Sequence, residues 1–110
     1  MKTIRQSIRC DIKVDAIEYW KGKDFWLPAR RAYTLIIDYP FNKEGRFQIK
    51  TGKGMGLLGL MARVYKAYKT MYRRAEKDDE QGYWHGIEDL VVEGITVNHK
   101  TKVIRLDIGS

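Results

Sequence analysis

Positively charged side chains are the strongest candidates for a functional site in this sequence, and many of them lie in one segment. Residues 51–77 hold seven Lys and Arg against one acidic residue. On a helix with about 100° per residue, six of these cations fall on the arc opposite the apolar residues. They are Arg63, Lys66, Lys69, Arg73, Arg74 and Lys77. Because Lys and Arg neutralise phosphates, this arc is a candidate surface for nucleic acid.

The segment that follows has the opposite charge. Residues 78–93 hold six acidic residues and no Lys or Arg. These acids could neutralise the basic arc within the fold or between two copies of the chain. The alternative to nucleic-acid binding is therefore a protein-interaction or assembly module, including one that self-associates.

An aromatic and basic cluster precedes this segment. Residues 19–26 interleave four aromatic residues with two lysines around Gly22, a pattern that predicts a hairpin with an exposed tip. Aromatic rings can stack on bases while cations contact phosphates. The residues assigned to such a site are Trp20, Lys21, Lys23, Trp26, Arg30 and Arg31. The same tryptophans could instead cap the sheet core or form a protein interface.

A glycine-rich stretch before the expected helix contains G-x-G-x-x-G at Gly54, Gly56 and Gly59. A dinucleotide-binding fold is not expected, because that fold needs several further helices and a parallel sheet. Lys53 is not followed by Ser or Thr, as a Walker A loop requires. Two interpretations remain. Lys53, Gly54 and Gly56 could bind an anion at the helix start, or the glycines could only allow close packing.

Catalytic chemistry has one weak candidate. His85 stands near Glu88 and Asp89, which could make it a general base or a metal ligand. No nucleophile accompanies it, since Cys10 occupies a position that predicts burial in the core. We therefore expect no enzyme activity, no cofactor and no metal site. The aromatics at 83–84 are expected to close the core over the helix end.

The elements that must position these residues follow from hydrophobic periodicity. Residues 4–14 alternate polar and apolar, broken only by Gln6, and predict a strand. Further strands are predicted at 31–39, 46–51, 90–97 and 102–108, with Gly94 as a possible bulge. One strongly amphipathic helix is predicted over 55–77. This order predicts an α+β fold: an antiparallel sheet of about five to six strands, one long amphipathic helix packed on one face, and a C-terminal β-hairpin.

Composition limits the remaining function classes. The 110 residues carry a net charge of +7 and are 44% hydrophobic, which is typical of one folded domain, residues 1–110. One cysteine excludes an internal disulfide framework. No apolar run approaches the about 20 residues of a membrane span, and the start does not resemble a signal peptide. The expectation is a cytoplasmic, non-enzymatic basic module that contacts nucleic acid.

Overall fold

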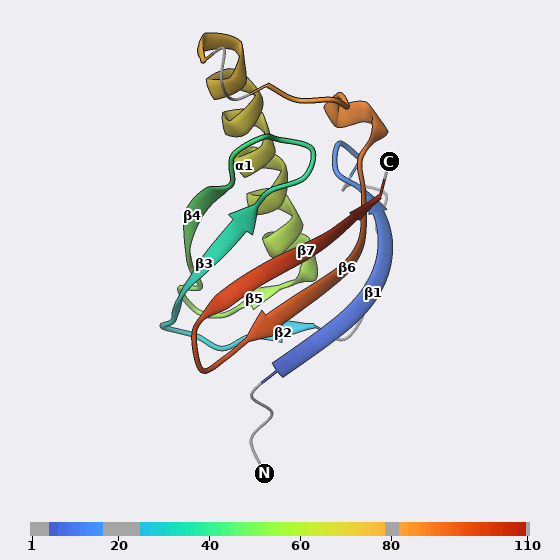
Figure 1. Cartoon of the computed structure of the whole chain (residues 1–110). Helices are drawn as coiled ribbons and strands as arrows, with labels where there is room; N and C mark the ends of the chain where they lie inside the picture. The colour runs from blue at the N-terminus through green and yellow to red at the C-terminus, as the bar shows by residue number, and fades with distance from the viewer. Residues whose placement is uncertain (1–4, 17–24, 79–81, 110) are drawn as a thin grey trace.

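The computed structural model describes residues 5–16, 25–78 and 82–109, and every structural statement below concerns these residues (Figure 1). They form an α+β fold, as predicted. The elements in chain order are β1 (Arg5–Lys13), β2 (Trp26–Leu27), β3 (Ala32–Ile37), β4 (Gly45–Lys50), β5 (Met55–Gly56), α1 (Leu57–Lys77), the 3₁₀ helix η2 (Ile87–Asp89), β6 (Val91–Asn98) and β7 (Val103–Gly109).

Five strands form the main sheet, in the order β1-β6-β7-β3-β4. The predicted C-terminal hairpin is confirmed as β6 and β7. This hairpin lies between β1 and β3, so it joins the two N-terminal parts of the sheet. Neighbouring strands are antiparallel except β3 and β7, which are parallel. The sheet is therefore mixed, because the direction of β7 is set by its hairpin with β6 and not by β3.

The alternation of β1 is confirmed, with Ile12 buried and its odd-numbered neighbours exposed. The strand contains a bulge between Arg9 and Ile12, where Asp11 has a φ of 54°. Cys10 is only half-buried, whereas the sequence predicted a core position. Its thiol donates a hydrogen bond to the carbonyl of Val92, at 3.3 Å. Its side chain still packs against the core, at the border of the cluster of buried residues.

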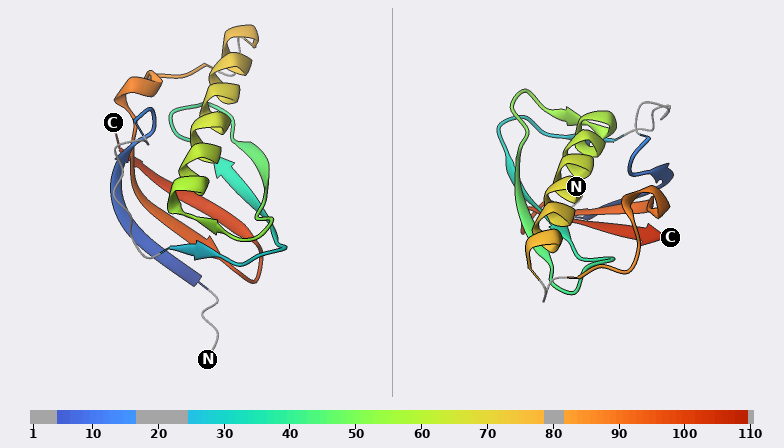
Figure 2. Two further views of the ribbon diagram at one scale, coloured as in Figure 1. Left: turned by 180° about the vertical axis from the view of Figure 1, so that it is seen from behind. Right: turned by 90° about the horizontal axis from the view of Figure 1, so that it is seen from above.

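Helix α1 lies across one face of the sheet, over β3 and β4 (Figure 2). It ends at Lys77, as predicted, and begins at Leu57 because Met55 and Gly56 form β5. Its apolar stripe is fully buried against the sheet core: Leu57, Leu60, Met61, Val64, Ala67, Tyr68 and Met71. Fixing this stripe against the core leaves the opposite arc of the helix facing outward. None of the described helices is long and apolar enough to span a membrane.

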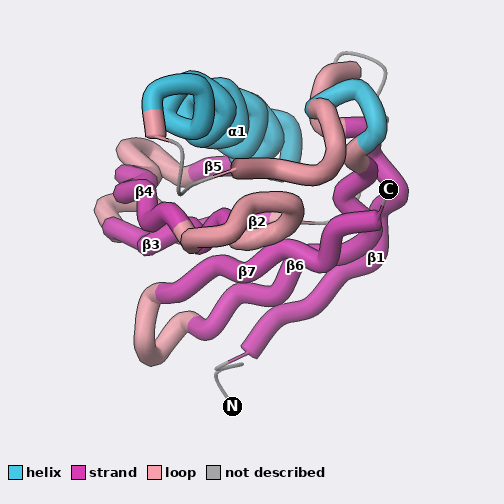
Figure 3. Tube along the Cα trace, turned by 45° about the horizontal axis from the view of Figure 1, so that its top comes forward, coloured by secondary structure: helices cyan, strands magenta, loops and turns pink. Residues whose placement is uncertain are grey.

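A second, two-stranded sheet consists of β2 and β5 (Figure 3). Trp26 pairs with Gly56, and Leu27 pairs with Met55. The sequence pattern did not predict the pairing of β2 with β5. It predicted a hairpin, in which residues 25–27 run back beside the residues that precede residue 21. The other half of the predicted hairpin, including Trp20, Lys21 and Lys23, lies outside the described residues. Leu27 is completely buried, so this small sheet is anchored in the main core.

Candidate nucleic-acid interface

The outward arc of α1 carries the predicted basic residues, and all six are exposed. They are Arg63, Lys66, Lys69, Arg73, Arg74 and Lys77; we call this surface the basic face. None of the six forms an ion pair with another residue in the described part of the chain. Two of the cations lie over aromatic rings, Lys69 over Tyr65 at 5.4 Å and Arg74 over Phe47 at 5.2 Å.

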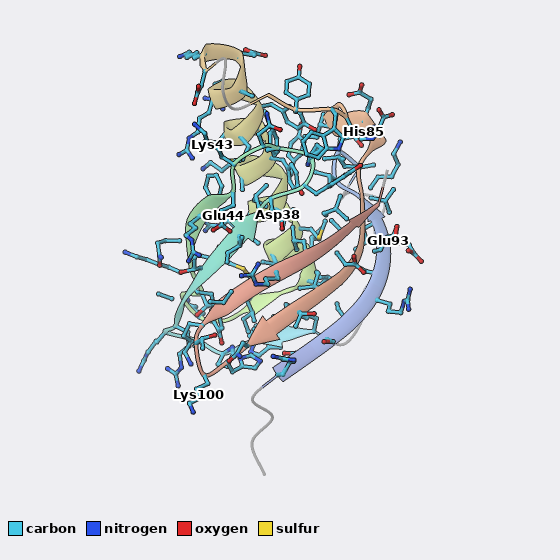
Figure 4. The ribbon with its side chains drawn as sticks, in the orientation of Figure 1. Asp38, Lys43, Glu44, His85, Glu93 and Lys100 are labelled. Carbon is cyan, nitrogen blue, oxygen red and sulfur yellow. The ribbon has the colours of Figure 1, made fainter. Side chains whose placement is uncertain are left out.

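The acidic segment does not cover the basic face with ion pairs among the described residues. Asp78 lies 3.8 Å from the Nζ of Lys43, and Asp89 lies 4.0 Å from the Nδ1 of His85. Glu93 belongs to β6 and lies beside β1, away from α1 (Figure 4). Asp79 and Glu80 fall outside the described residues. Glu88 lines one groove together with Lys69 and Arg73, but it forms no ion pair with them. The described acids of this segment therefore lie at several separate places, and one of them borders the basic face.

A shallow groove of about 210 Å³ follows one border of the basic face, between α1 and β4. Arg63, Lys66 and Thr70 form its helix side, while Phe47 and Gln48 contribute from the strand. This groove therefore separates the basic face from the edge strand β4.

A larger groove of about 490 Å³ follows the other border, between α1 and the segment 83–88. We call it the aromatic groove. Its lining residues are Lys69, Tyr72, Arg73, Glu76, Tyr83, Gly86, Ile87 and Glu88. Cations, carboxylates and tyrosine rings therefore meet in one depression.

Hydrogen bonding and ring packing hold the wall of the aromatic groove. The ring of Tyr72 lies 4.8 Å from that of Phe41 and 4.9 Å from that of Tyr83, each edge to face. The hydroxyl of Tyr72 donates to the carbonyl of His85 at 2.7 Å. Burial, and then the nearby Glu88 carboxylate, raise the pKa of Tyr72, so this hydroxyl keeps its proton. Tyr83 remains 48% exposed and Trp84 55% exposed.

The sequence analysis considered Glu88 only as a neighbour of the catalytic candidate His85, and it gave Tyr83 a packing role; it assigned neither to the nucleic-acid surface. In the sequence, Tyr72 falls at the border of the apolar arc of residues 55–77, beside Lys69, and an aromatic pair follows the helix at 83–84. The combination of these two signals would have suggested an aromatic border to the basic face. What the sequence does not show is that the segment folds back against that border.

Two other predicted sites converge at the start of α1. The indole of Trp26, 59% exposed, lies against Gly54 in the glycine-rich turn. The backbone N–H of Arg30 donates to the carbonyl of Gly52 at 2.8 Å. The N–H of Arg31 donates to the hydroxyl oxygen of Thr51 at 2.9 Å. Hydrogen bonds therefore join the glycine-rich turn to the described part of the predicted aromatic and basic cluster, which includes Trp26, Arg30 and Arg31.

The geometry of this turn favours its packing role. The N–H of Gly54 donates to the carbonyl of Thr51 at 2.8 Å, so it is already bonded. Gly56 belongs to β5 and is paired with Trp26. Lys53 is exposed beside them and remains a candidate for contact with a phosphate. The helix start has no side-chain cap and no acidic residue in its first turn.

His85 lies within the segment 83–88 that borders the aromatic groove (Figure 4). Its ring packs on Tyr39, with 5.9 Å between the ring centroids, and its Nδ1 faces Asp89. In the part of the chain that the structure describes, no group of three His, Cys, Asp or Glu side chains is placed to hold a metal ion. The contacts of His85 in the described residues include its packing on Tyr39 and its approach to Asp89.

No protein-family model, no curated protein and no solved structure matches the chain.

Proposed function

We propose that this protein is a non-enzymatic module that binds nucleic acid through the basic face of α1. The observation that carries the proposal is the exposure of all six cations on one side of a helix whose other side is buried. From Lys53 to Arg74 the chain contains no acidic residue that would offset them. Like charges three or four residues apart repel one another on a helix, so an external anion would relieve this repulsion.

The dimensions of the basic face suit a phosphate backbone. Arg63 and Lys77 are 14 residues apart, which corresponds to about 21 Å along the helix axis at about 1.5 Å per residue. One strand of a duplex carries a phosphate about every 3.4 Å along its axis, so this length spans about six phosphates. The two flanking grooves widen the surface on both sides of the helix.

The test replaces two central cations by acids, in the double variant Lys66→Glu plus Arg73→Glu. We expect at least a tenfold weaker affinity for nucleic acid, measured by fluorescence anisotropy at several salt concentrations. The slope of log K against log salt should become shallower by about two, because about two phosphate contacts are lost. Unfolding in urea should show that stability holds or rises slightly, as repulsion is reduced.

The matched control is Lys13→Glu plus Lys100→Glu, which changes the net charge by the same amount at two exposed positions outside α1. It should retain the affinity of the unmodified protein. If the helix variant loses stability and keeps its affinity, the acids of 78–93 neutralise the basic face and the proposal is wrong.

A protein-interaction or assembly module is the second candidate, and one observation favours it. Four large apolar side chains are exposed in the described ranges: Trp26, Leu58, Tyr83 and Trp84. Trp and Tyr are enriched at protein interfaces. Light scattering over a range of protein concentrations tests the self-associating form. A monomer at every concentration would contradict it.

A further inference from the structure

We infer that the aromatic groove receives a single unpaired nucleobase, and that it favours bases carrying an amino group. The inference rests on the proposed function and names the class of nucleic acid that the basic face would bind. A base in a duplex is stacked and paired, so only a single strand can present one to this groove.

Tyr83 supplies a stacking surface. Its ring packs against that of Tyr72, at an interplanar angle of 81°, and against that of Phe41, at 67°. An isolated β-bridge between Phe41 and Tyr83 fixes the backbone at the same place. About half of the side chain is nevertheless exposed toward solvent. An aromatic ring held in this way stacks on bases irrespective of their sequence.

The groove carries two cations and two carboxylates, and Glu76 on α1 is one of the carboxylates. Lys69 and Arg73 belong to the basic face and line the groove from the helix side. Glu88 lines it from the segment 83–88. A phosphate is attracted by the two cations and repelled by both carboxylates, so the backbone of the strand would lie outside the groove, on the basic face, while the base enters the groove toward Glu88. The groove volume of about 490 Å³ is within the range of about 300–1,000 Å³ that is usual for small-ligand sites.

Glu88 gives the groove its preference for bases that carry an amino group. The carboxylate of Glu88 lies so close to Gly86 that a Cβ on Gly86 would collide with it. The absence of a side chain at Gly86 therefore leaves room for this carboxylate. An ionised carboxylate only accepts hydrogen bonds. Cytosine, adenine and guanine carry an exocyclic amino group that donates, whereas thymine and uracil do not. Carboxylate recognition of the cytosine amino group is an established pairing.

The experiment measures the affinity of three labelled ligands at one salt concentration: dC12, dT12 and a 12-base-pair duplex. The variants are Tyr83→Leu, which keeps an apolar side chain against Phe41, its control Tyr83→Phe, and Glu88→Gln. We expect the unmodified protein to bind dC12 most tightly. Tyr83→Leu should weaken dC12 about tenfold and leave the duplex unchanged, while Tyr83→Phe should match the unmodified protein. Glu88→Gln should reduce the ratio of dC12 to dT12 affinity toward one.

The possible results separate this inference from the proposed function. If duplex and single strands bind equally and only Lys66→Glu plus Arg73→Glu weakens them, the inference is wrong and the proposed function stands. If no ligand binds at low salt, both are wrong. If Tyr83→Leu unfolds, the Glu88→Gln variant still decides, because Glu88 is exposed; an unchanged dC12 to dT12 ratio would overturn the preference.

Discussion

The indole of Trp26 covers Gly54 so closely that a Cβ on Gly54 would overlap the six-membered ring. Gly54 also has a φ of 114°, a backbone conformation that side chains rarely adopt. Two requirements for glycine therefore coincide at one residue. This contact joins the two-stranded sheet to the turn that begins α1.

The variant Gly54→Ala should lose more stability than Gly52→Ala. Gly52 has a φ of 56° and open space around its Cα, so alanine there costs only backbone strain, about 1 kcal/mol. Gly54→Ala must also displace Trp26, which adds about 1–3 kcal/mol. Urea unfolding measures the difference, and the tryptophan emission of Gly54→Ala should shift as the indole moves. Equal losses for the two variants would mean that the contact does not constrain the turn.

The hydroxyl of Thr51 is a second structural contact in this turn. It is buried, donates to the carbonyl of Pro28 at 2.6 Å and accepts the N–H of Arg31. Thr51→Val keeps the shape and leaves these backbone groups unpaired, so we expect a loss of about 1–3 kcal/mol. The control is Thr34→Val, whose half-exposed hydroxyl accepts only from the Gln48 amide; it should change stability by less than about 0.5 kcal/mol. Thermal or urea unfolding of the pair checks this.

Two separate substitutions by aspartate test which face of α1 is buried. Val64 is fully buried, so Val64→Asp places an unpaired charge in the core and should unfold the protein. Ala62 lies two residues away on the exposed side, and Ala62→Asp should remain folded. Circular dichroism with a urea titration distinguishes the two. A cooperatively folded Val64→Asp protein would show that the buried face has been assigned incorrectly.

A pH-dependent prediction concerns His99. Its Nδ1 accepts from the Tyr33 hydroxyl at 2.9 Å, and its Nε2 donates to Gln6 at 3.0 Å, so the neutral ring satisfies both contacts. Burial, and then the charge of Lys102, lower the pKa of His99 from 6.5. The unfolded state therefore binds the proton more readily. The resulting stability is present above pH 6.5 and is lost as the pH falls toward and through the lower folded-state pKa.

Unfolding free energies measured from pH 8 to pH 5 should show this loss. The variant His99→Gln lacks the titrating ring and should have a flatter profile over the same range. Parallel profiles for the two proteins would show that His99 does not couple to folding.

Regular periodicity is what made parts of this structure predictable from sequence. In β1 and α1 each residue's position in the repeat determines its exposure. The alternation of exposed and buried residues along β1 and the position of the basic face could therefore be predicted from the sequence. Gln6, the one exception in β1, is explained by its contact with His99. The strands β2 and β5 have two residues each, too few to show a period. The parallel pairing of β3 with β7, and the approach of Tyr83 to α1, depend on tertiary packing that no local pattern encodes.

The position of β7 between β6 and β3 has a consequence for how the protein is made. The hairpin of β6 and β7 at the centre of the sheet is synthesised after its partners β1 and β3, which come from residues 5–37. During translation these early strands have no central neighbour, and α1 is exposed with its apolar stripe only partly covered. Completion of the sheet must await the synthesis of residues up to Gly109. Pairings between segments so distant in the sequence form slowly, and apolar surface that stays exposed until the sheet is complete favours aggregation.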